Sequence, residues 1–177
     1  MKKSETLIKD LFVIKGFTAT DQRGMFKKIF QSELLSRKFH KINEVFYSIS
    51  HKNVLRGMHF QLPPFDNYKL VHVLNGSILD VTIDLRKKSP SFLKKLEVIM
   101  ESGYDSILIP PGVGHGFKSL EDNTIVLYLS SAEFRHANDG GILYSSISHD
   151  WKSRDFIVSD KDFNLPSLED FLRSNPF

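Results

Sequence analysis

The sequence predicts an all-β protein of the sandwich or barrel kind, from three observations. Short runs that alternate in polarity or are rich in β-branched residues recur along most of the chain. These runs follow one another at intervals of about ten residues. Gly, Pro, Asn and Ser turn signals separate them. Such spacing is typical of a sandwich or barrel rather than a parallel α/β sheet, and a double-sheet jelly roll fits the number of runs.

Each predicted element follows from its own local pattern. The predicted strands are residues 11–17, 26–30, 44–49, 54–61, 70–74, 77–85, 96–100, 106–109 and 125–129. Asn75-Gly76 between two of these runs predicts a β-hairpin. Ser32 predicts the start of a short helix over residues 33–38, and residues 166–172 predict a second short helix near the C-terminus. Because no repeat, low-complexity segment or linker interrupts the pattern, residues 1–177 are expected to form one domain.

Composition limits the classes of function. The chain has 177 residues, of which 41% are apolar and 25% charged, as in ordinary soluble domains. A net charge of +3 without a basic cluster does not favour nucleic acid as a partner. The absence of cysteine excludes disulfides, thiolate nucleophiles and thiolate metal sites. No apolar run has the roughly 20 residues of a membrane span, and no signal peptide is evident, so a cytoplasmic protein is expected.

The residues most suggestive of chemistry lie close together in the sequence. Arg56 and His59 lie on the predicted strand 54–61, and Lys69 follows eight residues later. This combination suggests a site for an anionic or carbonyl substrate. His115 lies in a Gly- and Pro-rich stretch, which we interpret as a turn after a strand. For both histidines the alternative is a core residue bonded to a backbone carbonyl.

A metal site is a second alternative, because β-barrel metal enzymes often place two histidines two residues apart on one strand. Here Gln61 is two residues after His59, and a cation, Lys69, occupies the later position where a carboxylate ligand would be expected. A lysine repels a divalent metal, so the spacing argues against metal dependence.

The same residues support proton transfer without a metal. His59 is a suitable general base if a carboxylate orients it, and Lys69 and Arg56 are suited to stabilise an enolate oxygen. A tyrosine is then expected to return a proton to the opposite face of the carbon. Tyr128 is the first candidate and Tyr144 the second, although a tyrosine inside a strand is by default core packing.

At this point the chain resembles the dTDP-4-dehydrorhamnose 3,5-epimerase family along nearly its whole length. The resemblance rests on the order and spacing of several motifs rather than on any single one. They are residues 21–26, 54–61, 69–71, 80–86 with 89–90, 111–117, 127–128 and 159–162. The resemblance implies a cupin-type jelly roll and a homodimer without metal or organic cofactor. It further implies epimerisation of a nucleotide-linked 4-keto-6-deoxyhexose in deoxysugar biosynthesis for cell-surface polysaccharide such as the O-antigen of lipopolysaccharide.

The resemblance also implies roles for individual residues. It makes His59 the proton acceptor, Asp162 its carboxylate partner, Tyr128 the proton donor and Lys69 the residue that stabilises the enolate oxygen. Further substrate-binding positions are Arg23, Lys28, Glu44, Phe46, Arg56, Asp80, His115, Phe134, Asp139 and Lys161.

Five of these positions depart from the family pattern. The family usually has glutamate at Lys28, glutamine at Glu44, asparagine at Phe46, tyrosine at Phe134 and glutamate at Asp139. Since these positions serve mainly the nucleotide, we hypothesise that the sugar chemistry is kept while the carrier differs from dTDP, with CDP as one possibility. The sequence does not say whether C3, C5 or both are inverted. The competing classes are a metal-dependent cupin isomerase or dioxygenase and a non-catalytic sugar-nucleotide-binding cupin.

Overall fold

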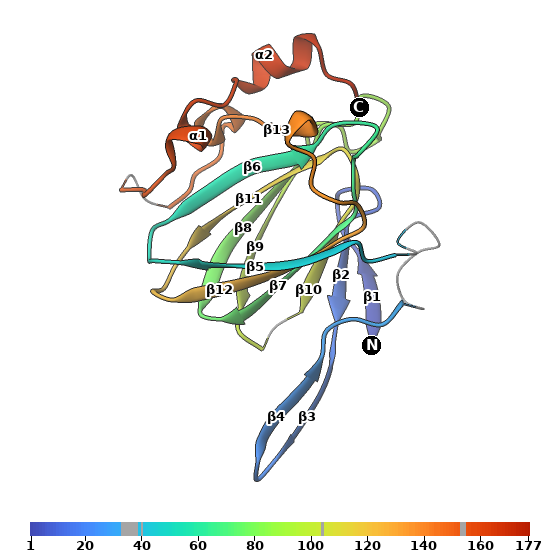
Figure 1. Cartoon of the computed structure of the whole chain (residues 1–177), viewed down its shortest axis with the longest axis vertical. Helices are drawn as coiled ribbons and strands as arrows, with labels where there is room; N and C mark the ends of the chain where they lie inside the picture. Colours follow the sequence, from blue (N-terminus) through green and yellow to red (C-terminus); the bar gives the residue numbers. More distant parts are fainter. Residues whose placement is uncertain (33–38, 40, 104, 153–154) are drawn as a thin grey trace.

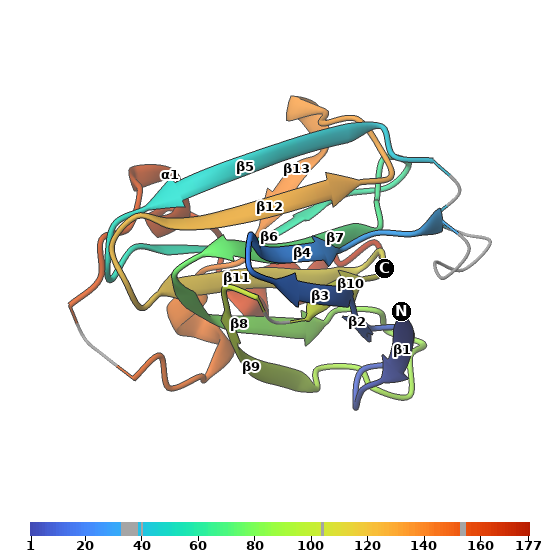
Figure 2. The same ribbon diagram turned by 90° about the horizontal axis from the view of Figure 1, so that it is seen from below.

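The fold, in a computed structural model, consists of two β-sheets that pack face to face with a separate hairpin beside them (Figures 1 and 2). The structure describes residues 1–177 except 33–38, 40, 104 and 153–154. One sheet has the strand order β1-β2-β10-β7-β12-β5 and the other β13-β6-β11-β8-β9, while β3 pairs with β4. All pairings within the sheets are antiparallel, so the predicted all-β double-sheet architecture is confirmed.

The elements are short, as the turn spacing predicted. The strands of the six-stranded sheet are β1 (Lys2–Glu5), β2 (Phe12–Lys15), β5 (Glu44–Ser50), β7 (Lys69–Asn75), β10 (Ser106–Ile109) and β12 (Thr124–Ser130). Those of the five-stranded sheet are β6 (Leu55–Gln61), β8 (Ser77–Asp84), β9 (Lys95–Glu101), β11 (Val113–Ser119) and β13 (Asp139–Gly141). The hairpin strands are β3 (Phe17–Asp21) and β4 (Gly24–Lys28). The helices are η2 (His136–Asn138), η3 (Tyr144–Ile147), α1 (Asp160–Phe163) and α2 (Leu168–Arg173).

The main core lies between the two sheets. Its apolar side chains come from both of them, for example Val71 and Val126 from one sheet and Ile78 and Phe117 from the other. A second cluster covers the outer face of the five-stranded sheet, where α2 and the C-terminal segment pack (Figure 1). Strand β8 is therefore buried on both faces, and all of its residues, polar ones included, are buried.

Two local predictions are wrong. Asn75-Gly76 does not close a hairpin, because β7 and β8 belong to different sheets. Gly76 has φ 75° and lies against Thr124, so it turns the chain at the corner between the sheets. The predicted strand 11–17 is two strands, which diverge at Gly16. A Cβ on Gly16 would lie 2.8 Å from the carbonyl oxygen of Lys28, so the chain passes very close to β4 there.

Other differences concern short elements. β1, β11, β13, α1 and residues 18–21 of β3 were not predicted from the sequence. His115 lies within β11 rather than in a turn. The C-terminal helix is confirmed as α2, where the Ser167 hydroxyl accepts from the backbone N–H of Asp170 at 3.1 Å. The helix predicted over residues 33–38 lies outside the described residues.

A β-bulge in β6 determines which side chains face the space between the sheets. His59 lies opposite His115, but Arg56 lies opposite Phe117, so three steps along β6 match two steps along β11. Side chains alternate along a regular strand, and Arg56 and His59 would then point to opposite faces. The extra residue reverses the alternation, and both side chains line the same cavity. Gly57, with φ 125°, lies in this bulge.

We expect Gly57→Ala to lower the free energy of unfolding by about 2 to 4 kcal/mol, because a Cβ there combines positive φ with overpacking. That Cβ would lie 2.4 Å from the Cα of Gly116. Gly24→Ala is the matched control, since Gly24 has φ 121° but a Cβ there meets nothing within 4 Å. Its expected cost is about 1 kcal/mol. Urea denaturation measures both, and equal losses would contradict the importance of the close approach between β6 and β11.

Candidate active site

A cavity of about 1120 Å³ opens between the two sheets, and its lining residues include members of β5, β6, β12 and α1. Eleven of the predicted site residues line it. They are Glu44, Phe46, Arg56, His59, Lys69, His115, Tyr128, Phe134, Asp139, Lys161 and Asp162. Residues that lie far apart in the sequence are therefore brought together by the fold in one pocket.

His59 and Asp162 form the first histidine–carboxylate pair. The Nε2 atom of His59 lies 3.1 Å from Oδ1 of Asp162, and the other carboxylate oxygen accepts from the backbone N–H of Gly57 at 2.9 Å. Asp162 is held on α1, whose N-cap Ser159 accepts from the Asp162 backbone N–H. Leu55 N–H donates to the carbonyl of Ile157 at 3.0 Å, which fixes the segment before α1 beside β6.

This pairing favours the carboxylate form of Asp162 and one tautomer of His59. Burial acts to raise the pKa of Asp162, but hydrogen bonds from His59, Gly57 and Ser159 outweigh it and hold that pKa below its ordinary value. Asp162 is thus a carboxylate at neutral pH and favours a proton on Nε2 of His59. Nδ1 of His59 is then the nitrogen that can accept a proton, as a general base requires.

His115 and Asp80 form a second pair behind the first. Nε2 of His115 lies 2.6 Å from Oδ2 of Asp80, and both side chains are buried. His115 is the direct cross-strand partner of His59, so the two imidazoles lie side by side on the inner face of the five-stranded sheet. Asp80 does not line the cavity itself but orients the histidine that does.

Lys69 brings a cation into the same space. It begins β7 and is partly buried in the cavity wall. Burial lowers the pKa of Lys69, while the carboxylates of Asp139 and Asp80 act to raise it. Within the described part of the chain, its ammonium group has no hydrogen-bond or ion-pair partner. Such a lysine is suited to bind a ligand oxygen that carries or develops negative charge.

Tyr128 lies on β12, in the sheet opposite His59. Its hydroxyl lies 3.4 Å from Oγ of Ser48, and its ring stacks on Phe46. Burial raises the pKa of Tyr128 well above its ordinary value, so the phenol is neutral and able to donate a proton. Tyr144, the second candidate, is not among the lining residues and packs against Trp151 and Phe156.

The outer part of the cavity combines aromatic rings with charged groups. Oε1 of Glu44 accepts from the backbone N–H of Phe134 at 2.8 Å, and the Phe134 ring is exposed. Lys161 forms an ion pair with Asp139. The Arg56 guanidinium donates to Oγ of Ser50 at 3.1 Å. An exposed ring beside a carboxylate and cations is a suitable surface for a nucleobase and its phosphates.

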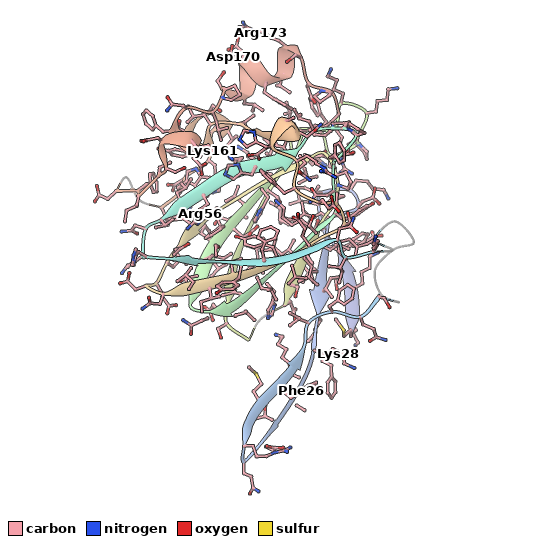
Figure 3. The ribbon with its side chains drawn as sticks, viewed as in Figure 1. Phe26, Lys28, Arg56, Lys161, Asp170 and Arg173 are labelled. Carbon is pink, nitrogen blue, oxygen red and sulfur yellow. The ribbon has the colours of Figure 1, made fainter. Side chains whose placement is uncertain are left out.

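Two predicted residues lie away from this cavity. Arg23 is at the tip of the β3–β4 hairpin, where it pairs with Asp21, and Lys28 ends β4 (Figure 3). The hairpin projects from the body of the chain, so neither side chain reaches the pocket of its own chain (Figures 1 and 3).

Sequence reasoning missed some polar lining residues. Ser48 was not singled out, although it follows Glu44 and Phe46 at every second position of a predicted strand and could have been found from that alternation. Asn67 and Ser130, which hydrogen bond to each other at 2.6 Å, gave no comparable signal. Among the residues the structure describes, no three His, Cys, Asp or Glu side chains gather as a metal site would require, and no helix is long and apolar enough to cross a membrane.

Sequence comparisons identify relatives along nearly the whole chain. A family model described as dTDP-4-dehydrorhamnose 3,5-epimerase matches residues 5–170. A relative of that name from Shigella flexneri is 34% identical over 172 residues, covering 93% of this chain and 94% of the relative. Another from Methanothermobacter thermautotrophicus is 35% identical over 183 residues, covering 97% and 95%.

Solved structures agree with these relatives. The dTDP-4-dehydrorhamnose 3,5-epimerase of Bacillus anthracis, with TDP and PPi bound, has a TM-score of 0.89 at 32% identity and covers 94% of this chain and 99% of its own. The epimerase of Legionella pneumophila in complex with dTDP-4-keto-L-rhamnose has a TM-score of 0.88 at 30% identity, covering 95% and 93%. The cupin-type jelly roll is thereby confirmed, and a metal-dependent cupin is not favoured. The chain therefore belongs to the dTDP-4-dehydrorhamnose 3,5-epimerase family and is an isomerase of the epimerase class.

Proposed function

We propose that this epimerase inverts C3, C5 or both of a nucleotide-linked 4-keto-6-deoxyhexose through an enolate. One observation supports this most directly: a histidine–carboxylate pair and a neutral tyrosine line one cavity from opposite sheets. Inversion needs a base on one face of a carbon and an acid on the other, and His59 and Tyr128 are placed for these roles. The ligand of the Legionella pneumophila epimerase, dTDP-4-keto-L-rhamnose, belongs to the proposed substrate class.

The proposed reaction has two proton transfers. Nδ1 of His59 takes the proton from the carbon beside the C4 ketone, and the electron pair of the C–H bond forms the enolate. Lys69 stabilises the enolate oxygen, with Arg56 as a second cation. Tyr128 then donates its phenolic proton to the opposite face of the same carbon. The proton on His59 returns through solvent to the phenolate, so the net reaction is an isomerisation.

The reaction serves deoxysugar biosynthesis in this proposal. Its role in O-antigen formation and the cytoplasmic location expected from the sequence stay predictions. A binding protein without turnover would have no use for an acid and a base on opposite walls, so the catalytic interpretation is preferred to the non-catalytic one.

The two transfers are separable by solvent deuterium. We expect the wild-type protein to incorporate deuterium at each carbon it inverts, as read by NMR. His59→Ala should reduce incorporation about 100- to 10,000-fold, because the base is lost. Tyr128→Phe should abolish inversion while exchange through His59 continues. Incorporation at neither carbon by the wild type, or full activity of either variant, would contradict the proposal.

The hypothesis of a carrier other than dTDP depends mainly on Glu44. A carboxylate offers only hydrogen-bond acceptors, whereas thymine presents carbonyl acceptors beside a single N–H donor, and cytosine and guanine each present an amino donor. We expect CDP or GDP to bind more tightly than dTDP or UDP in calorimetric titrations. Glu44→Gln should reduce the difference. Tightest binding of dTDP by the wild type would contradict the hypothesis.

We also propose a homodimer, in which each hairpin reaches the partner chain. The β3–β4 hairpin exposes Phe17 and Phe26, and β5, which lies at the edge of its sheet beside β12, exposes Val45, Tyr47 and Ile49. Exposed apolar side chains on an edge strand favour association with a second chain. In this arrangement Arg23 and Lys28 serve the pocket of the partner rather than their own.

Light scattering after size-exclusion chromatography tests the dimer. We expect Phe26→Asp to produce a monomer, because a carboxylate would be buried in the interface. Ile99→Asp is the matched control. Ile99 is about as exposed as Phe26 but lies on β9, at the edge of the other sheet. This variant should therefore stay dimeric. A Phe26→Asp dimer as stable as the wild type would contradict the proposed interface.

A further inference from the structure

Phe46 covers the ring of Tyr128. The two residues are direct cross-strand partners on β5 and β12, and their rings lie nearly parallel, with centroids 4.9 Å apart and an interplanar angle of 17°. Phe46 is 44% exposed and Tyr128 only 7%. Phe46 thus forms the cavity wall over one face of the phenol, with Tyr128 beneath it.

Ser48 contacts the other end of Tyr128. It is the next residue of β5 on the same face as Phe46, and it lies opposite Val126, two residues before Tyr128 on β12. Its Oγ lies 3.4 Å from the Tyr128 hydroxyl, and either oxygen can donate. Strand β5 therefore supports Tyr128 at two points, the ring face and the hydroxyl.

We propose that Phe46 and Ser48 are positioning residues for Tyr128, with Phe46 holding the ring and excluding water from it and Ser48 directing the hydroxyl. This inference rests on the proposed function of Tyr128 as proton donor. A phenol transfers its proton efficiently only when the hydroxyl points at the reacting carbon, so a ring held on one face and at its tip is oriented before the substrate arrives. In this proposal Phe46 positions the proton donor, in addition to making its predicted contact with the substrate.

The surroundings of Tyr128 are consistent with its proposed role as a neutral proton donor. Burial has the largest influence and raises the pKa of Tyr128, and the hydrogen bond with Ser48 acts in the opposite direction. Asp80 on β8 adds to the rise, and Arg56 on β6 opposes it. The other titratable groups of the cavity wall are Glu44 on β5, His59 on β6, Lys69 on β7, His115 on β11, Asp139 on β13, and Lys161 and Asp162 on α1. Removal of the Phe46 ring admits water and lowers the pKa toward its ordinary value.

The test is the variant Phe46→Ala in the full-length protein, with three readouts. We expect kcat to fall about 10- to 100-fold with little change in KM, because the donor is displaced. The alkaline limb of the kcat–pH profile should move to lower pH, since a donor with a lower pKa loses its proton earlier as the pH rises. Deuterium incorporated into unepimerised substrate should increase relative to product, because His59 still removes and returns the proton.

Three further variants sharpen the test. Phe46→Leu keeps an apolar cover and should restore part of kcat and of the alkaline limb. Ser48→Ala should also raise the exchange-to-inversion ratio, but by less. Phe134→Ala is the matched control, because Phe134 is another half-exposed ring of the cavity wall that contacts His136 rather than Tyr128. It should raise KM and leave the alkaline limb and the exchange ratio unchanged.

Two results would overturn the inference. A Phe46→Ala protein that changes only KM would make Phe46 a substrate contact alone. If kcat, the pH profile and the exchange ratio of Phe46→Ala all equal those of the wild type, Phe46 does not position Tyr128. Both results differ from failure of the proposed function, which would appear as full activity of Tyr128→Phe. Leu at position 46 retains the apolar surface of the strand, so the comparison remains available if the alanine variant does not fold.

Discussion

The candidate active site depends on one extra residue in β6. Gly57 adds a step to that strand opposite β11, and the alternation of side chains reverses between Arg56 and His59. Without this step, one of the two would face the helices outside the sheet. The same residue presents its backbone N–H to Asp162, so the bulge also orients the carboxylate that holds His59. Only a glycine fits at position 57, because a Cβ there would lie 2.4 Å from the Cα of Gly116 on the neighbouring strand.

The cavity occupies a part of the sandwich that apolar side chains would otherwise fill. Buried charges are costly unless they are paired, and here Asp80 pairs with His115 and Asp162 with His59. Lys69 has no such partner among the described residues, and the lowering of its pKa by burial reflects that cost. The apolar core between the sheets is packed around residues such as Val73 and Ile78. We infer that this core supplies the stability that permits a polar cavity in the same sandwich.

The sequence predicts most of the long strands because alternation in polarity is a local property, whereas pairing between strands is not. Asn75-Gly76 shows the limit: the dipeptide specifies a tight turn, but the next strand enters the other sheet, which no local pattern records. Asp162 and His59 are 103 residues apart, so only resemblance to a family could pair them in advance. Phe46 differs, because the family resemblance does not predict its contact with Tyr128. The family usually has asparagine at this position, and an asparagine has no ring to stack on the phenol.

Strand β5 contributes residues both to the candidate active site and to the proposed dimer interface. Its inward residues, Glu44, Phe46 and Ser48, line the cavity, and its outward residues, Val45, Tyr47 and Ile49, are exposed on the edge of the sheet. An edge strand is bonded along one side only and is more easily displaced than a central strand. A partner chain over the outward residues would restrain the inward ones, because both sets share one backbone. In the proposed dimer, association therefore restrains Phe46 and Ser48, which contact Tyr128. It also brings Arg23 and Lys28 to the pocket of the partner chain.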